Sequence, residues 1–223
     1  MITIYHIEAR RSERVAWLME ELGLPYELTF TEKDIIASSQ AIKAVHPIGA
    51  APTIRDGDLL LCESAAILEY IINRHGGGRL GVRPDQAQYP LYLQWLHFAE
   101  GSAMSRIMGE FMLKPLLKEV SVDRSPIARL HLGASKRMAE FFELSLAGRP
   151  FFAGAAFTAA DIMMFLPASF CLRGRTAADY PLLSAWTERM TARPAYQRML
   201  ARALPNGPPP SLMGWPKENP APG

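Results

Sequence analysis

The chain has 223 residues, a formal net charge of +2 and a hydrophobic fraction of 49%, which suits one large or two small domains with a buried core. Its Lys and Arg residues are scattered along the chain, whereas nucleic-acid-binding proteins gather them on one face, so we expect no nucleic-acid partner. The two cysteines, Cys62 and Cys171, fit neither a zinc motif nor a disulfide framework, so we expect no metal site. The chain shows no signal peptide and no apolar run of about 20 residues, which predicts a cytoplasmic protein with no membrane partner.

The first part of the chain predicts a small mixed sheet flanked by helices. Residues 2–7 are β-branched and aromatic, which indicates a strand. Residues 15–22 are helix formers with one apolar face, and Gly23 ends this helix. Residues 26–30 alternate as a second strand, which must run parallel to the first because a helix joins them. With a weaker helix over 34–45 and the hairpin described next, the order is βαβαββα.

The stretch from residue 46 to 64 is the most informative part of the sequence. Asp56 and Gly57 stand between two apolar runs, which predicts a β-hairpin with a type I′ turn and positive φ at both residues. Pro52 opens the first strand, where no N–H is needed and a cis peptide is possible. Ser64 precedes a strong helix former, so we predict that it is the N-cap and that the free N–H groups behind it can hold a carboxylate.

Glycine and proline mark a boundary near residues 75–84. We therefore expect one domain over residues 1–78 and a second, all-helical domain over 86–204. The remaining segment, 205–223, is rich in proline and glycine and is expected to form an extended tail without a core of its own.

The helical domain is expected to begin with a long apolar helix over residues 86–112. Ser125 and Pro126 predict the start of another helix, which keeps one apolar face as far as Phe141. Thr158 and Asp161 stand at the spacing of a capping box at the start of a further helix. Two short helices, over residues 181–190 and 194–203, complete the domain.

Four stretches of the chain resemble the soluble glutathione transferases, in a bacterial-like form. Residues 14–27 are similar to the family's first helix and second strand, and residues 46–52 to its Asn-Pro-x-Gly-x-Val-Pro loop. Residues 61–70 resemble its Glu/Gln-Ser helix start, and residues 151–162 resemble its C-terminal capping motif. The resemblance implies a thioredoxin-like N-terminal α/β domain, an all-helical second domain, a homodimer and a detoxification enzyme that uses glutathione as co-substrate.

The resemblance also implies which residues bind glutathione. The backbone of Ala51, the residue before Pro52, would pair with the cysteinyl amide, because an extended peptide can add to an exposed sheet edge whatever its side chains. Ser64 and the helix start would hold the γ-glutamyl carboxylate, and Glu63 would bind the ammonium group. The alternative is that Glu63 and Ser64 only cap a helix, but the proline loop upstream favours binding.

Transfer chemistry requires the glutathione thiolate, because a thiol with a pKa of about 8.5 is only a few per cent ionised at pH 7. Serine-type members of the family carry the activating Ser four residues before the helix arginine, which is Arg14 here, and that position is Arg10 in this chain. The candidates for activation are therefore Ser12, Arg10 and Tyr5. Each also has a structural interpretation, as a helix cap, a surface cation and a strand residue respectively.

A pocket for a small hydrophobic electrophile is expected between the domains. Met104, Met108 and Phe111 fall on the helix that faces this cleft in the family, and methionine suits varied apolar substrates, although core or dimer contacts are an equal alternative. The predicted function is glutathione transfer to such an electrophile. The alternatives on the same fold are a glutathione-dependent isomerase, an ether- or thioether-cleaving enzyme, and a low-turnover glutathione-binding protein.

Overall fold

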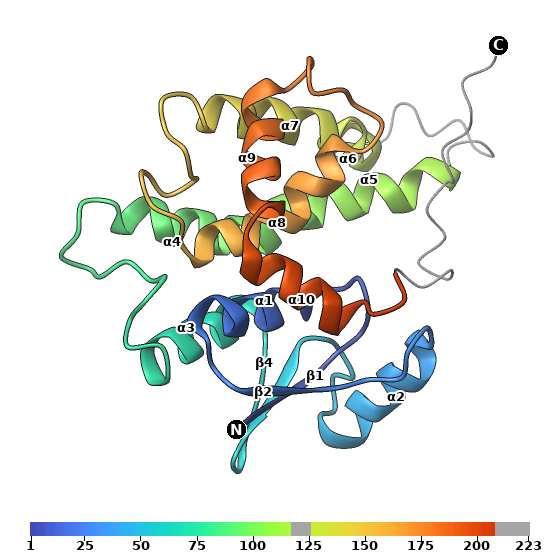
Figure 1. Cartoon of the computed structure of the whole chain (residues 1–223). Helices are drawn as coiled ribbons and strands as arrows, with labels where there is room; N and C mark the ends of the chain where they lie inside the picture. Colours follow the sequence, from blue (N-terminus) through green and yellow to red (C-terminus); the bar gives the residue numbers. More distant parts are fainter. Residues whose placement is uncertain (117–125, 208–223) are drawn as a thin grey trace. The chain divides into compact units, whose positions relative to one another are not determined.

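The computed structural model describes residues 1–116 and 126–207, and these residues form two compact units. The N-terminal unit consists of Met1–Gly81 together with the described residues from Thr191 onward, and the helical unit is Val82–Met190 (Figure 1). Within the described residues, no helix is long and apolar enough to cross a membrane.

A four-stranded mixed sheet is the framework of the N-terminal unit. Its strands are β1 (Ile2–Tyr5), β2 (Tyr26–Thr29), β3 (Thr53–Asp56) and β4 (Leu59–Cys62), in the order β2-β1-β3-β4. Strand β1 runs parallel to β2 and antiparallel to β3, and β3 runs antiparallel to β4. This arrangement confirms the predicted fold of the first domain.

The helices of this unit pack against the sheet and against each other. They are α1 (Glu13–Leu22), α2 (Ile35–Val45) and α3 (Ser64–Arg74). Helix α1 contacts α3, whereas α2 packs on β1, where Ile42 joins Tyr5 in a buried apolar cluster. As predicted, α1 ends at Gly23, which has the left-handed φ of 65° that glycine adopts without steric cost.

Two details around the hairpin differ from the sequence prediction. Asp56 pairs with Leu59, so the loop residues are Gly57 and Asp58, and of these only Gly57 has a positive φ. The predicted type I′ turn centred on Asp56 and Gly57 is therefore wrong, because the strand register moves the turn by one residue. The predicted N-cap is also wrong: Glu63 occupies that position, and Ser64 is the first residue of α3.

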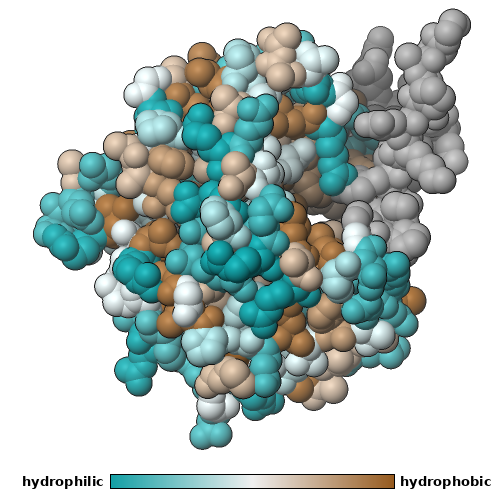
Figure 2. Space-filling model, in the orientation of Figure 1, coloured by the Kyte–Doolittle hydropathy of each residue, from teal (hydrophilic) through white to brown (hydrophobic). Residues whose placement is uncertain are grey.

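The last described helix, α10 (Pro194–Ala203), packs on α1 within the N-terminal unit, although its sequence suggests a place in the helical domain. Figure 1 shows the two helices side by side. Glu21 forms a bidentate ion pair with Arg193 at 2.6 and 2.9 Å, and Glu20 pairs with Arg198 at 2.8 Å. Hydrophilic side chains lie over α10 in Figure 2, so the helix buries its apolar face and exposes its charged one.

The helical unit contains a continuous segment of α4 (Tyr89–Phe98), the π-helix η1 (Ala99–Met104) and α5 (Ser105–Leu116). The remaining helices are α6 (Pro126–His131), α7 (Ala134–Ser145), α8 (Ala159–Leu172) and α9 (Pro181–Thr191).

The two helices predicted at the start of this unit differ in detail from the structure. The helix expected over 86–112 is interrupted by the π-helical turn of η1. The helix expected after Ser125 and Pro126 is divided at Gly133, whose φ of 69° ends the regular spiral. Ser125 itself lies outside the described residues.

Aromatic side chains fill the core of the helical unit. The ring of Phe152 lies 4.7 Å from Trp95 and 4.9 Å from Trp186, and all three residues are almost fully buried. The predicted capping box of α8 is confirmed, because Thr158 and Asp161 exchange side-chain to backbone hydrogen bonds. Asp161 also accepts from the indole N–H of Trp186 at 3.2 Å, which ties the helix start to the aromatic core.

Candidate functional site

The sheet topology brings three separate chain segments to one end of the N-terminal unit. Tyr5, the last residue of β1, pairs with Thr53, the first residue of β3, and Thr53 also pairs with Cys62, the last residue of β4. The last residues of β1 and β4 and the first residue of β3 therefore lie at the same end of the sheet. This places the loop after β1 beside the Ala51-Pro52 segment and the start of α3.

The Ala51–Pro52 peptide bond is cis, as the sequence allowed. Pro52 is buried, whereas Ala51 is partly exposed and packs against the apolar cluster of Tyr5 and Ile42. No backbone hydrogen bond found in the described part of the chain engages Ala51. An extended peptide could therefore pair with Ala51 and continue the β3 ladder.

The start of α3 has an unusual backbone conformation and a buried hydroxyl. Glu63 is exposed and has φ 77° and ψ 116°, a conformation that costs energy in a residue with a Cβ and is typical of functional sites. Ser64 is buried, and Arg14 Nη1 lies 3.5 Å from its Oγ. Because the first N–H groups of a helix attract anions, this helix start with a buried arginine behind it suits a carboxylate.

The structure places Tyr5 in the core beneath α2. The side chain is 9% exposed, and its hydroxyl accepts a hydrogen bond from Arg55 Nε at 3.3 Å. Tyr5 therefore contributes to the packing of α2 on the sheet and to the position of Arg55.

Ser12 is fully buried at the start of α1, and its hydroxyl is engaged by the chain itself. Its Oγ lies 2.8 Å from His6 Nδ1 and accepts from the Ile7 N–H at 3.2 Å. His6 Nε2 lies 2.9 Å from the Ala203 carbonyl oxygen, which can only accept, so Nε2 carries a proton. Burial lowers the pKa of His6 to about 4, so the ring is neutral at pH 7. Its unprotonated Nδ1 therefore accepts a hydrogen bond from the Ser12 hydroxyl.

This chain of hydrogen bonds fastens the loop after β1 to the end of α10. The hydroxyl proton of Ser12 is held by His6, which leaves Ser12 no donor for a bound thiol. The sequence gives no sign of this arrangement, because the spacing of Ser12 from the helix arginine is compatible with both catalysis and capping.

Arg10 differs from the other two candidate activators, because its functional group is only half-buried and largely unused. One guanidinium nitrogen donates to the Ala9 carbonyl at 3.3 Å. Burial and the neighbouring Arg11 lower the pKa of Arg10, whereas Glu13 opposes them. An arginine keeps its charge under these conditions, so Arg10 presents a cation and further N–H donors at this end of the sheet.

Two acidic residues at the ends of the same loop are a feature that sequence reasoning missed. Glu8 is 3% exposed, and its Oε2 accepts from the Lys33 N–H at 2.6 Å, while its Oε1 is buried without a partner among the described residues. Glu13 Oε1 is likewise buried and unpartnered in the described chain. In the sequence, both glutamates belong to a polar stretch that predicts a solvated loop, so no signal reveals that one carboxylate oxygen of each is buried.

The three residues expected to line an electrophile pocket lie along η1 and α5. Met104 is 2% exposed and belongs to the core of the helical unit, whereas Met108 and Phe111 are half-buried. Their spacing places them on one helix face. The described residues contain no group of three or more His, Cys, Asp or Glu that could hold a metal ion, and both cysteines are free thiols.

Comparison with known sequences assigns both parts of the chain. Residues 4–79 match the model of the glutathione S-transferase N-terminal domain, and residues 124–194 match that of the C-terminal domain. The chain is 30% identical over 208 residues to glutathione S-transferase 3 of Zea mays, with 89% of this chain and 91% of the relative covered. It is 29% identical over 210 residues to glutathione S-transferase 3 of Schizosaccharomyces pombe, covering 87% and 85%.

Solved structures give the same result. A glutathione S-transferase from Actinobacillus pleuropneumoniae is 25% identical, with a TM-score of 0.74 over 91% of this chain and 93% of that one. A theta class enzyme from Xanthomonas axonopodis pv. citri, solved with glutathione bound, is 26% identical, with a TM-score of 0.64 over 88% and 95%. The chain belongs to the glutathione S-transferase family.

Proposed function

We propose that this protein binds glutathione at the end of its sheet where β1 and β4 end and β3 begins. Arg10 stabilises the thiolate there, and the sulfur is transferred to a small apolar electrophile. The observation that carries this proposal is the register of β1, β3 and β4, in which Tyr5 pairs with Thr53 and Thr53 with Cys62. The segments that lead to Arg10, Ala51 and Ser64 therefore start from the same end of the sheet. The theta class relative from Xanthomonas, which has glutathione bound, supports glutathione as the co-substrate.

The γ-glutamyl and cysteinyl parts of glutathione each have a matching group in this proposal. The unpaired backbone of Ala51 pairs with the cysteinyl amide, and the first turn of α3 with Ser64 holds the γ-glutamyl carboxylate. The exposed carboxylate of Glu63 takes the ammonium group. Buried Arg14, 3.5 Å from the Ser64 hydroxyl, adds positive charge behind the carboxylate.

Arg10 is the activating residue in this proposal, because the Ser12 hydroxyl donates to His6 and Tyr5 is buried in the apolar cluster beneath α2. Lowering the thiol pKa by about two units requires about 2.7 kcal/mol of preferential stabilisation of the thiolate. Two unit charges about 4 Å apart near a protein surface interact by about 4 kcal/mol, so one guanidinium is sufficient. The positive end of α1 adds to this effect.

The rest of the function follows the family pattern. Met108 and Phe111 line the electrophile site from α5, with Met104 supporting them from the core. A homodimer in a cytoplasmic, reducing setting completes the proposal, and the free thiols of Cys62 and Cys171 are compatible with that setting.

Steady-state conjugation of a chloronitrobenzene tests the role of Arg10. We expect Arg10→Ala to lower kcat/KM by about 30-fold, equivalent to about 2 kcal/mol of transition-state stabilisation. Ser12→Ala should instead destabilise the fold by about 2 kcal/mol, because it leaves His6 Nδ1 buried without a donor. Glu27→Gln, which changes an exposed residue on β2, is the matched control and should leave kcat/KM unchanged. An unchanged rate in Arg10→Ala would contradict the assignment.

A low-turnover glutathione-binding protein is the second candidate, and the burial of both Ser12 and Tyr5 favours it. Calorimetric titration with glutathione, followed by ultraviolet absorbance of the thiolate, separates the two. Binding with thiolate formation supports the transferase, whereas binding without thiolate supports the binding protein. Turnover of isomerisable or ether substrates in place of the chloronitrobenzene would instead indicate the other predicted activities.

A further inference from the structure

The loop that carries Arg10 lies between two glutamates, buried Glu8 and half-buried Glu13. Glu8 lies before Arg10 and Glu13 after it, and each has one carboxylate oxygen that is buried without a partner in the described part of the chain. The backbone N–H of Ala9 donates to the Glu13 carboxylate, and the N–H of Glu13 donates to the Arg10 carbonyl at 3.1 Å. Glu13 is therefore fixed against the turn that presents Arg10.

The groups around Glu13 include both signs of charge. Arg10 and Arg14 attract its carboxylate, Glu8 repels it, and Tyr196 approaches from α10. Burial raises the pKa of Glu13 to about 7, against the Ala9 hydrogen bond and the two arginines. Burial also raises the pKa of Tyr196 to about 12, so Tyr196 is a neutral neighbour at physiological pH. Glu13 is thus the group at this turn that can change its charge near neutral pH.

We propose that Glu13 takes up a proton when the glutathione thiolate forms beside Arg10, so that the thiolate replaces Glu13 as the counter-ion of Arg10. This inference rests on the proposed function. The physical reason is that a half-buried cation such as Arg10 balances one adjacent anion, whereas a second anion beside it repels the first. Protonation of Glu13 removes its negative charge, so Arg10 then interacts with the thiolate sulfur alone.

The step balances in protons and charge. The S–H bond of glutathione breaks with both electrons left on sulfur, and its proton passes to water. A proton from water binds the Glu13 carboxylate. When the sulfur attacks the electrophile, its negative charge enters the new C–S bond and the leaving group departs as an anion, after which Glu13 returns its proton to water. Glu13 acts through Arg10, so it is a positioning residue and not a catalytic one.

Counting protons against thiolates tests the inference. Glutathione is added to the full-length protein in weak buffer, proton release is followed with a pH indicator, and thiolate is followed by ultraviolet absorbance. At a pH of about 7.5 we expect about half a proton released per thiolate in the parent protein, and about one in Glu13→Gln, which cannot take up a proton. Glu27→Gln should behave as the parent does.

The outcomes separate this inference from the proposed function. No thiolate in the parent would overturn the proposed function, whereas thiolate with one proton released in both parent and Glu13→Gln would overturn only the role of Glu13. If Glu13→Gln does not fold, the parent alone decides. Its ratio should rise toward one below pH 6, where Glu13 is already protonated, and a ratio of one at every pH between about 6 and 8 would refute the proposal.

Discussion

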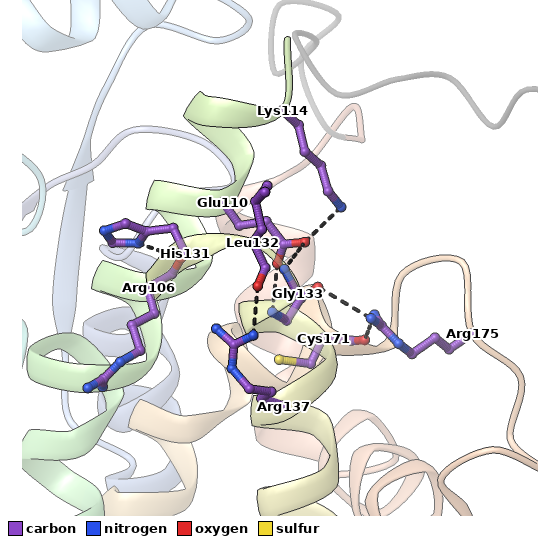
Figure 3. A network of polar contacts seen from close by, with 10 residues as sticks. Arg106, Glu110, Lys114, His131, Leu132, Gly133, Arg137, Cys171 and Arg175 are labelled. Atoms are coloured by element: carbon purple, nitrogen blue, oxygen red, sulfur yellow. Dashed lines mark hydrogen bonds and ion pairs between the residues drawn. The ribbon is translucent and has the colours of Figure 1, made fainter. Parts of the chain in front are cut away.

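Buried carboxylates are treated differently in the two units of this protein. In the helical unit, Glu110 is 4% exposed and fully engaged: it accepts from the N–H groups of Gly133 and Ser135 at 3.2 and 2.7 Å, and pairs with Lys114 at 2.9 Å. Figure 3 shows this carboxylate between Lys114 and the start of α7. Burial opposes ionisation, but these donors hold the pKa of Glu110 below its usual value.

Asp161 is likewise fully bonded, since its oxygens accept from Phe152, Thr158 and Trp186, although burial outweighs these donors and raises its pKa. In contrast, Glu8 and Glu13 in the N-terminal unit each keep a buried oxygen without a partner in the described chain. Helix starts supply donors that satisfy a structural carboxylate. The loop after β1 leaves one carboxylate oxygen of Glu8 and one of Glu13 without a donor in the described chain. This incomplete hydrogen bonding distinguishes the candidate site from the helical unit.

The largest effect should come from removing a fully bonded carboxylate. We expect Asp161→Asn to lower the free energy of unfolding by about 4 kcal/mol, because the amide cannot accept on both sides and places a donor against N–H groups. Urea denaturation measures the change. Glu140→Gln, at an exposed ion pair, is the control and should change stability by less than about 0.5 kcal/mol. A small effect of Asp161→Asn would remove the contrast between the units.

The next effect depends on pH and comes from His6. Burial lowers its pKa from 6.5 to about 4, so below pH 6.5 the unfolded chain binds a proton that the folded chain does not. The stabilisation is complete above pH 6.5, falls as the pH drops toward 4, and is constant below that. Relative to His6→Gln, the parent should lose about 3 kcal/mol of unfolding free energy between pH 7 and pH 4. Parallel pH-dependent slopes in parent and variant would contradict this.

Replacing the incompletely bonded Glu13 should have the opposite sign from Asp161→Asn. The pKa of Glu13 is raised from 4.5 to about 7, so its stabilising contribution is complete below pH 4.5 and is lost as the pH rises through 7. Glu13→Gln should therefore be about 3 kcal/mol more stable, relative to the parent, at pH 8 than at pH 4. Thermal or urea unfolding at both values measures it, and a loss of stability at pH 8 would mean that Glu13 is structural.

The smallest effect concerns the close packing next to Glu110. A Cβ added to Gly109 would lie 2.1 Å from His131 Nδ1, so the ring must move. We expect Gly109→Ala to lower the unfolding free energy by about 1 kcal/mol, since the clash outweighs the better helix propensity of alanine. In a His131→Ala background the same change should be stabilising. Equal effects in both backgrounds would show that the His131 ring is not the obstacle.

Local patterns predicted most of the fold. Strand alternation, the glycine that ends α1, and the capping box of Thr158 and Asp161 all depend on neighbours within a few residues. The errors arose where distant contacts decide. The pairing of Asp56 with Leu59 places the turn at Gly57 and Asp58. Helix α10 packs on α1 with the help of ion pairs, which the periodicity of the sequence does not reveal.

The candidate site divides along the same line. Ala51, Pro52 and Ser64 could be identified because their roles depend on short motifs. The state of Ser12 could not, because it depends on His6 and on a carbonyl from the far end of the chain. The buried carboxylate oxygens of Glu8 and Glu13 could not be predicted either, since a solvated polar loop has the same composition.

The bond from His6 to Ala203 joins residues 197 positions apart. During synthesis, a chain released as far as α9 still lacks the partner of His6 and the helix that covers α1. The site loop can therefore reach its final form only after nearly the whole polypeptide has left the ribosome, and contacts of such long range slow folding. A fragment that ends after Gly81 would contain every proposed glutathione ligand and still lack the support that holds them in place.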